Sequence, residues 1–141
     1  MPLVCLVYVS FATHPMSDAE LHLILAKARE KNKRLNVTGM LLYREGFFMQ
    51  ALEGEKQVVD ALFAIIRHDK RHHKLWVVYE QEIKERIFKS WAMGFNHIDQ
   101  LSEEEEGFFE LVNGMNNLQI FVERPSIARG LLERFKDRSF F

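Results

Sequence analysis

Three polar side chains, Tyr8, Asn32 and Gln50, occupy positions that are otherwise apolar. Gln50 lies within the run Phe47 to Leu52, whose other members favour a buried strand. A primary amide that is buried without hydrogen-bond partners costs about 1–3 kcal/mol, so Gln50 must find partners inside the protein. The amides of Asn32 and Gln50 together carry donors and acceptors that suit a planar ligand edged with alternating C=O and N–H groups.

Each of these side chains also has a purely structural explanation. Asn32 falls in the apolar stripe of a predicted helix, near its end, where it could act as a C-terminal cap. Tyr8 could be a core tyrosine with its hydroxyl at the rim, and Gln50 could face water on an edge strand. The ligand hypothesis therefore depends on whether the fold brings all three to one place.

The segments that must position these side chains alternate between strands and helices. Apolar runs rich in β-branched and aromatic residues indicate strands, and the Ser17 to Glu20 segment has the form of a capping box. The predicted strands cover residues 3–10, 37–43, 47–53, 75–79 and 91–98, and the predicted helices begin at Ser17 and at about Lys56, the second ending near His68.

This order of elements predicts an α+β fold, a ferredoxin-like βαββαβ sheet with an extra strand. Right-handed crossovers place the first strand beside the third, with both helices on one face of the sheet. That arrangement brings Tyr8 near Gln50, and the helix that carries Asn32 covers the same face. The three polar side chains are therefore predicted to converge.

The composition changes after residue 98, so we divide the chain into residues 1–98 and a C-terminal extension, residues 99–141. An acidic run, Glu103 to Glu106, opens one predicted helix that ends near Asn113, and a second is predicted from Pro125 to Lys136. Both have an apolar stripe. We expect them to pack on the same domain as a helical cap over the free face of the sheet.

The bulk composition restricts the class of protein. Nineteen basic and twenty acidic residues give a formal charge of −1, which argues against non-specific nucleic-acid binding. Cys5 is the single cysteine, so there is no disulfide framework and a reducing compartment is expected. No apolar stretch reaches the roughly 18–20 residues that a membrane span needs. We expect a cytoplasmic protein that does not bind membranes.

Besides Tyr8, Asn32 and Gln50, further residues along the chain match the sequence pattern of a known family in order and spacing. The set comprises Tyr8 and Ser10, Asn32, the run Thr38 to Leu41, Phe48, Gln50, the run Leu52 to Gly54, Ile66, Asp69, the run Arg71 to His73, Trp91 and Met93. In order and spacing, from about residue 3 to 98, the chain resembles the BLUF family, the blue-light receptors that use FAD.

The resemblance implies a noncovalent FAD that lies between the two helices, with its ring edge against the sheet. Gln50 would bond flavin N5 and O4 on one side and the Tyr8 hydroxyl on the other. Asn32 would hold the O4/N3 edge of the ring, and Ile24 and Ile66 would sandwich it. The buried amide of Gln50 would then have its partners.

The resemblance further implies a hydrogen-bond switch, in which Tyr8 supplies an electron and a proton together and Gln50 emerges with its amide reoriented or tautomerised. Trp91 and Met93, near the glutamine in the family, would link the switch to output. By this resemblance the chain would act in signalling and not in enzymatic turnover. Because few residues follow residue 98, we expect output through a protein partner or a change of homo-oligomer. The alternatives are a flavin-dependent redox enzyme and a ligand-free ferredoxin-like interaction module.

The basic segment after the second helix is the weaker part of the pattern. Asp69 is expected to bind the ribityl hydroxyls of the cofactor, and Arg71 or His72 is expected to lie near its pyrophosphate. His68 and His72 lie four residues apart, but no carboxylate or cysteine completes a metal site, so no metal is expected. Lys31 departs from the family, where Asn or His commonly precedes the asparagine. It could place a cation beside O2 or the ribityl chain, or point to solvent.

Overall fold

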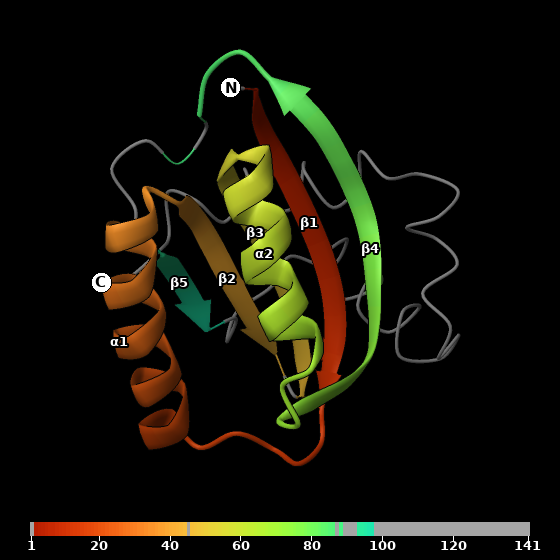
Figure 1. The fold of residues 1–141 in the computed structure, drawn as a ribbon. Helices are drawn as coiled ribbons and strands as arrows, with labels where there is room; N and C mark the ends of the chain where they lie inside the picture. Colours follow the sequence, from red (N-terminus) through yellow and green to blue (C-terminus); the bar gives the residue numbers. More distant parts are fainter. Residues whose placement is uncertain (1, 45, 87, 89–92, 98–141) are drawn as a thin grey trace, which may run out of the picture.

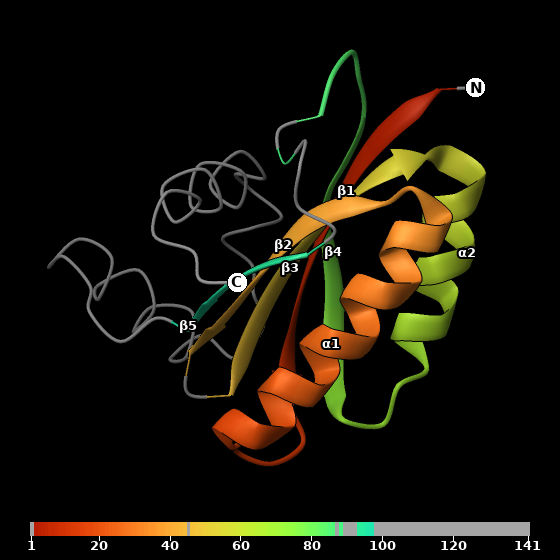
Figure 2. The same ribbon diagram turned by 90° about the vertical axis from the view of Figure 1, so that its left-hand side faces the viewer.

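The chain folds into one sheet with two helices on the same face (Figures 1 and 2). The computed structural model describes residues 2–44, 46–86, 88 and 93–97. Within them the elements are β1 (Leu3–Ala12), α1 (Asp18–Leu35), β2 (Thr38–Arg44), β3 (Phe47–Glu55), α2 (Lys56–Arg67), β4 (His72–Ile83) and β5 (Gly94–His97).

The described strands form a five-stranded sheet in the order β4-β1-β3-β2-β5. Neighbouring strands are antiparallel, except that β5 runs parallel to β2. The predicted α+β, ferredoxin-like arrangement is confirmed, and β1 lies beside β3 as the crossover rule requires. In that pairing Tyr8 is directly opposite Gln50. Directly opposed residues of antiparallel strands project from the same face, so the two side chains meet.

The ends of α1 show which asparagine acts as the cap. At the start, Ser17 Oγ accepts the Glu20 N–H at 3.1 Å and Glu20 Oε1 accepts the Ser17 N–H at 3.2 Å, which completes the predicted capping box. At the end, Asn36 adopts the left-handed conformation with φ 56°, and its N–H donates to the carbonyls of Asn32 and Lys33. The capping explanation for Asn32 is therefore wrong, because Asn36 fills that position.

Both faces of the sheet are buried. The face beneath the helices packs against their apolar stripes, with Leu6, Leu52, Leu21, Leu25 and Leu62 among the core side chains. The alternate residues of the same strands lie on the far face, and these are also fully buried: Val7, Val9, Met40, Leu42 and Met49. Neither α1 nor α2 lies on the far face (Figure 2). The helix-covered face is the one on which Tyr8 and Gln50 lie.

The first three strands differ from their predicted bounds by one or two residues at an end, and the fourth differs by more. Residues 75–79 were predicted for the fourth strand, whereas β4 extends from His72 to Ile83. Its added ends are polar because β4 is an edge strand, and register shifts against β1 disturb the alternation of side chains. The described part of the fifth strand is Gly94–His97, within the predicted 91–98. Trp91 and the predicted helices after residue 98 lie outside the described residues.

No helix in the described part of the chain is both long and apolar enough to cross a membrane. The cytoplasmic location stays a prediction.

Candidate functional site

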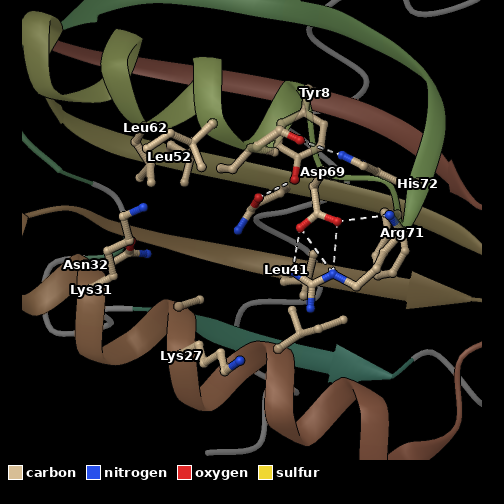
Figure 3. Close-up of a pocket in the computed structure, with 16 residues that line it drawn as sticks. Tyr8, Lys27, Lys31, Asn32, Leu41, Leu52, Leu62, Asp69, Arg71 and His72 are labelled. Atoms are coloured by element: carbon tan, nitrogen blue, oxygen red, sulfur yellow. Dashed lines mark hydrogen bonds and ion pairs between the residues drawn. The ribbon is translucent and has the colours of Figure 1, made fainter.

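A pocket of about 320 Å³ lies between α1 and α2, with the sheet as its floor. It lies within the size range of small-molecule sites in proteins. Figure 3 shows Lys27, Lys31 and Asn32 on the α1 side, Leu62 on the α2 side, and Asp69 with Arg71 near Tyr8. All nine residues predicted to bind the cofactor line this pocket: Tyr8, Ile24, Lys31, Asn32, Gln50, Ile66, Asp69, Arg71 and His72.

A chain of buried hydrogen bonds crosses the floor of the pocket. The Tyr8 hydroxyl donates to Gln50 Oε1, and Gln50 Nε2 donates to the sulfur of Met93 at 3.4 Å. Tyr8, Gln50 and Met93 are 4%, 7% and 0% exposed, so the chain is shielded from water. The two ends of the Gln50 amide thus have different partners. A rotation of that amide would turn its donor toward Tyr8 and its acceptor toward Met93.

The surroundings of Tyr8 keep its hydroxyl protonated. Burial raises the pKa of Tyr8 far above its usual value, the negative charge of Asp69 raises it further, and Arg71 partly opposes both. The ring packs against Phe63 with a centroid distance of 5.6 Å and against His72 at 6.0 Å. Tyr8 is therefore a neutral phenol held in one orientation as a hydrogen-bond donor.

Asp69 and Arg71 form an ion pair at the edge of the pocket. Arg71 Nε donates to both carboxylate oxygens of Asp69, at 2.9 and 3.1 Å, and the Arg71 backbone N–H donates to Oδ1 at 2.9 Å. These bonds lower the pKa of Asp69 to about 2. Both side chains stay partly exposed, at 30% and 48%. The pair therefore offers a ligand in the pocket both a carboxylate, which accepts hydrogen bonds, and a guanidinium, which donates them.

His72 connects three elements around Tyr8. Its Nε2 lies 2.7 Å from the carbonyl oxygen of Ile66, which can only accept, so Nε2 carries a proton and donates. In the neutral ring, Nδ1 then accepts from the hydroxyl of buried Ser10 at 2.8 Å. Both ring nitrogens of His72 are thus bonded within the protein. The end of α2 is tied to β1 and β4 beside Tyr8.

Both helices supply the walls of the pocket. Asn32, at 2% exposed, and half-buried Lys31 come from α1, together with Ile24. Ile66 comes from α2, so the two isoleucines line the pocket from different helices. Lys27 also lines it and was not predicted. Lys27 lies one helical turn before Lys31, so helical spacing alone could have predicted that both side chains lie on the same face of the helix.

Glu53 was expected only as part of the family pattern, yet it lies in a second polar cluster. It is 0% exposed, and its Oε1 accepts the Thr38 hydroxyl at 3.0 Å and the Phe88 N–H at 3.0 Å. Arg86 Nη1 donates to the Thr38 hydroxyl and to the Glu53 carbonyl, both at 2.9 Å, and Nη2 donates to the Asn36 carbonyl at 2.8 Å. The cluster fixes the chain after β4 to β2 and β3.

Within the described residues, no group of three or more His, Cys, Asp or Glu side chains is placed to hold a metal ion.

Comparison with known proteins identifies the family. The family model BLUF, described as sensors of blue-light using FAD, matches residues 3–94. The photoactivated adenylate cyclase subunit alpha of Euglena gracilis is 44% identical over 88 residues, which cover 62% of this chain and 9% of that protein. The photoactivated adenylate cyclase subunit beta of Euglena longa is 40% identical over 92 residues, which cover 64% of this chain and 11% of that protein. The chain therefore spans about a tenth of the length of these curated relatives.

Solved structures show the same fold. The dark state of BlrB, a BLUF protein, has a TM-score of 0.71 and 28% identity, and the match covers 92% of this chain and 97% of that one. A bacterial light-regulated adenylyl cyclase has a TM-score of 0.73 and 30% identity, and the match covers 86% of this chain and 36% of that one. With the family model, the fold and the Tyr8–Gln50 hydrogen bond in agreement, the chain belongs to the BLUF family of flavin-binding blue-light sensors.

Proposed function

We propose that the flavin of this sensor is FAD, bound noncovalently between α1 and α2. The pocket fits a flavin in two respects: Ile24 and Ile66 are apolar side chains on different helices, and the amides of Asn32 and Gln50 provide hydrogen-bonding groups for a ring edge. FAD rather than FMN is favoured by the family description. Lys27 and Lys31, one turn apart on α1, add two positive charges that suit a diphosphate.

The remaining roles follow from what each side chain can offer. Asp69 would accept hydrogen bonds from ribityl hydroxyls, and Arg71, which also lines the pocket, would offer its positive charge to the diphosphate. His72 acts by positioning, because both its ring nitrogens are already bonded to Ser10 and Ile66. This assignment leaves Arg71, and not His72, as the candidate for the pyrophosphate contact.

The observation that carries the proposed mechanism is the buried chain from Tyr8 through Gln50 to Met93. Flavin excited by blue light is a strong oxidant. Tyr8 can give up an electron and a proton together, and in the structure the first acceptor for that proton is Gln50 Oε1. When the electron and the proton return, Tyr8 is restored, so nothing is consumed. Gln50 is left with its amide reoriented or tautomerised, and its bonds to Tyr8 and Met93 change.

For output, we propose a photosensor that acts on a protein partner or through its own oligomer, and not as an enzyme. Residues 99–141 are proposed to form a helical extension of the same domain. The support is that far-face residues such as Val7 and Met49 are fully buried although α1 and α2 lie on the other face. Truncation after Ile98 should expose apolar surface while flavin stays bound. A truncated protein that remains monomeric and responsive to its partner would contradict this role.

The experiment for the proposed function combines cofactor extraction with illumination. Flavin released from the purified protein should elute as FAD on chromatography, and blue light should shift the flavin absorption reversibly to the red. Gln50→Leu, which removes the amide, should abolish the shift, whereas Gln57→Leu on the exposed surface of α2 should keep it. FMN as the natural ligand would contradict the choice of FAD. A normal shift in Gln50→Leu would contradict the switch.

A further inference from the structure

Arg29, a residue outside the flavin pocket, is bonded to the backbone of Met93. Its Nε donates to the Met93 carbonyl at 2.9 Å, across 64 positions of the sequence. The sulfur of the same methionine accepts from Gln50 Nε2. Met93 is therefore held at both ends, its backbone by α1 and its side chain by β3.

The surroundings of Met93 leave it little freedom. It is completely buried, and a Cβ added to Gly39 would lie 3.4 Å from its terminal methyl, so that methyl packs against β2 where no side chain intervenes. Gly94, the next residue, begins β5 and pairs with Met40 of β2. Among the described strands β5 pairs with β2 alone, at the edge of the sheet. The bond from Arg29 thus fixes the entry to a short edge strand.

The position of Arg29 on α1 joins this contact to the pocket. Ala28 and Asn32, on either side of it in the helix, both line the pocket. One face of α1 therefore borders the pocket, while the neighbouring face carries the donor to Met93. A hydrogen bond from a guanidinium is stronger than one from a neutral donor, and this one is partly buried. Met93 therefore connects α1, Gln50 and the start of β5.

We propose that Arg29 is a positioning residue of the light switch. It fixes the Met93 backbone to α1, so that in the dark the thioether is held on Gln50, and a change at Gln50 is passed to the start of β5. The proposal rests on the proposed hydrogen-bond switch for its signalling role. Its structural part, the placement of Met93 in the dark, does not require light.

The test compares Arg29→Ala with Arg34→Ala, which removes the same side chain from an exposed position on the same helix. Alanine is the best helix former, so α1 should persist in both variants. With methionine methyls labelled with ¹³C, the Met93 resonance is assigned from its loss in Met93→Leu. In the dark, that resonance should move or broaden in Arg29→Ala and stay unchanged in Arg34→Ala.

The second readout is the rate at which the red-shifted state returns to the dark state. The amplitude of the shift should persist in Arg29→Ala, because Tyr8 and Gln50 are intact. Recovery should slow by a factor of about 2 to 10, the change that one net hydrogen bond supports. An unchanged Met93 resonance or an unchanged recovery rate would overturn the proposal.

If Arg29→Ala loses its flavin, Arg29→Gln retains a side-chain N–H on a shorter stem, and we expect the same direction of change in both readouts. If the wild-type protein shows no red shift, the proposed switch fails. The dark comparison of the Met93 resonance would still decide whether Arg29 positions Met93.

Discussion

Replacement of Gly39 by alanine should force β2 and β3 apart beside the Gln50–Met93 contact. A Cβ at Gly39 would lie 2.0 Å from the carbonyl oxygen of Ala51 and 3.0 Å from its carbon. A carbon and a carbonyl oxygen approach comfortably at about 3.3 Å, so the two strands must separate by roughly 1 Å. The obstacle is backbone, which cannot rotate away as a flexible side chain would.

The expected loss of stability follows from two contributions. Overpacking a close-packed interior costs about 1–3 kcal/mol, and each ladder hydrogen bond weakened around the Gly39–Leu52 register adds about 0.5–1.5 kcal/mol. With two such bonds weakened, the free energy of unfolding falls by about 2–6 kcal/mol. A domain of this kind has only about 5–15 kcal/mol in total. Urea unfolding followed by circular dichroism, with flavin bound, would measure the change.

Gly46→Ala is the matched control, because its strain has another origin. Gly46 has φ +87°, and nothing lies within 4 Å of an added Cβ, so only backbone strain of about 1–2 kcal/mol is expected. Gly39→Ala should therefore be the more destabilising substitution and should also disturb the flavin spectrum. Equal or smaller destabilisation at Gly39 would refute the steric reasoning.

Asn32, Glu53 and Asp69 can each be tested by substitution. Asn32→Ala should weaken flavin retention by about 2- to 10-fold or shift the dark spectrum, with α1 intact; unchanged affinity and spectrum would leave Asn32 a structural role only. Glu53→Ala should orphan two buried donors and lower the free energy of unfolding by about 2–6 kcal/mol, whereas Glu55→Ala, an exposed control, should change it little. Because the folded pKa of Asp69 is depressed from 3.8 to about 2, its stabilisation is present above pH 4 and is lost as pH falls toward 2. The stability difference between wild type and Asp69→Asn should therefore shrink over that range, and a constant difference would contradict the assigned ion pair.

The sequence was sufficient to predict how Tyr8 and Gln50 meet. Strand order and the right-handed crossover rule place β1 beside β3, and alternation within each strand determines the face. Asn32 was harder to interpret, because a helix C-terminus has no local signal strong enough to choose between two asparagines four residues apart. The structure assigns the cap to Asn36, because of the two asparagines only Asn36 takes the left-handed conformation.

Other features leave no periodic pattern in the sequence. The ends of β4 are polar because an edge strand faces solvent, so residues such as Glu80 and Glu82 carry no strand signal. The bond from Arg29 to the Met93 carbonyl joins a side chain to a backbone group 64 residues away. A backbone acceptor imposes no residue type at its position, so sequence inspection could not find this contact.

The measurement that tests the hydrogen-bond switch most directly is a light-minus-dark difference spectrum of Tyr8→Phe. The substitution deletes one hydroxyl and keeps the ring, so the protein should fold and remain yellow. Tyr43→Phe is the matched control: Tyr43 is equally buried, but its hydroxyl accepts the Met16 N–H at 2.9 Å instead of bonding to Gln50. We expect the reversible red shift in the wild type and in Tyr43→Phe, and its loss in Tyr8→Phe. A wild-type red shift in Tyr8→Phe would show that Tyr8 is only a core tyrosine and would contradict the switch.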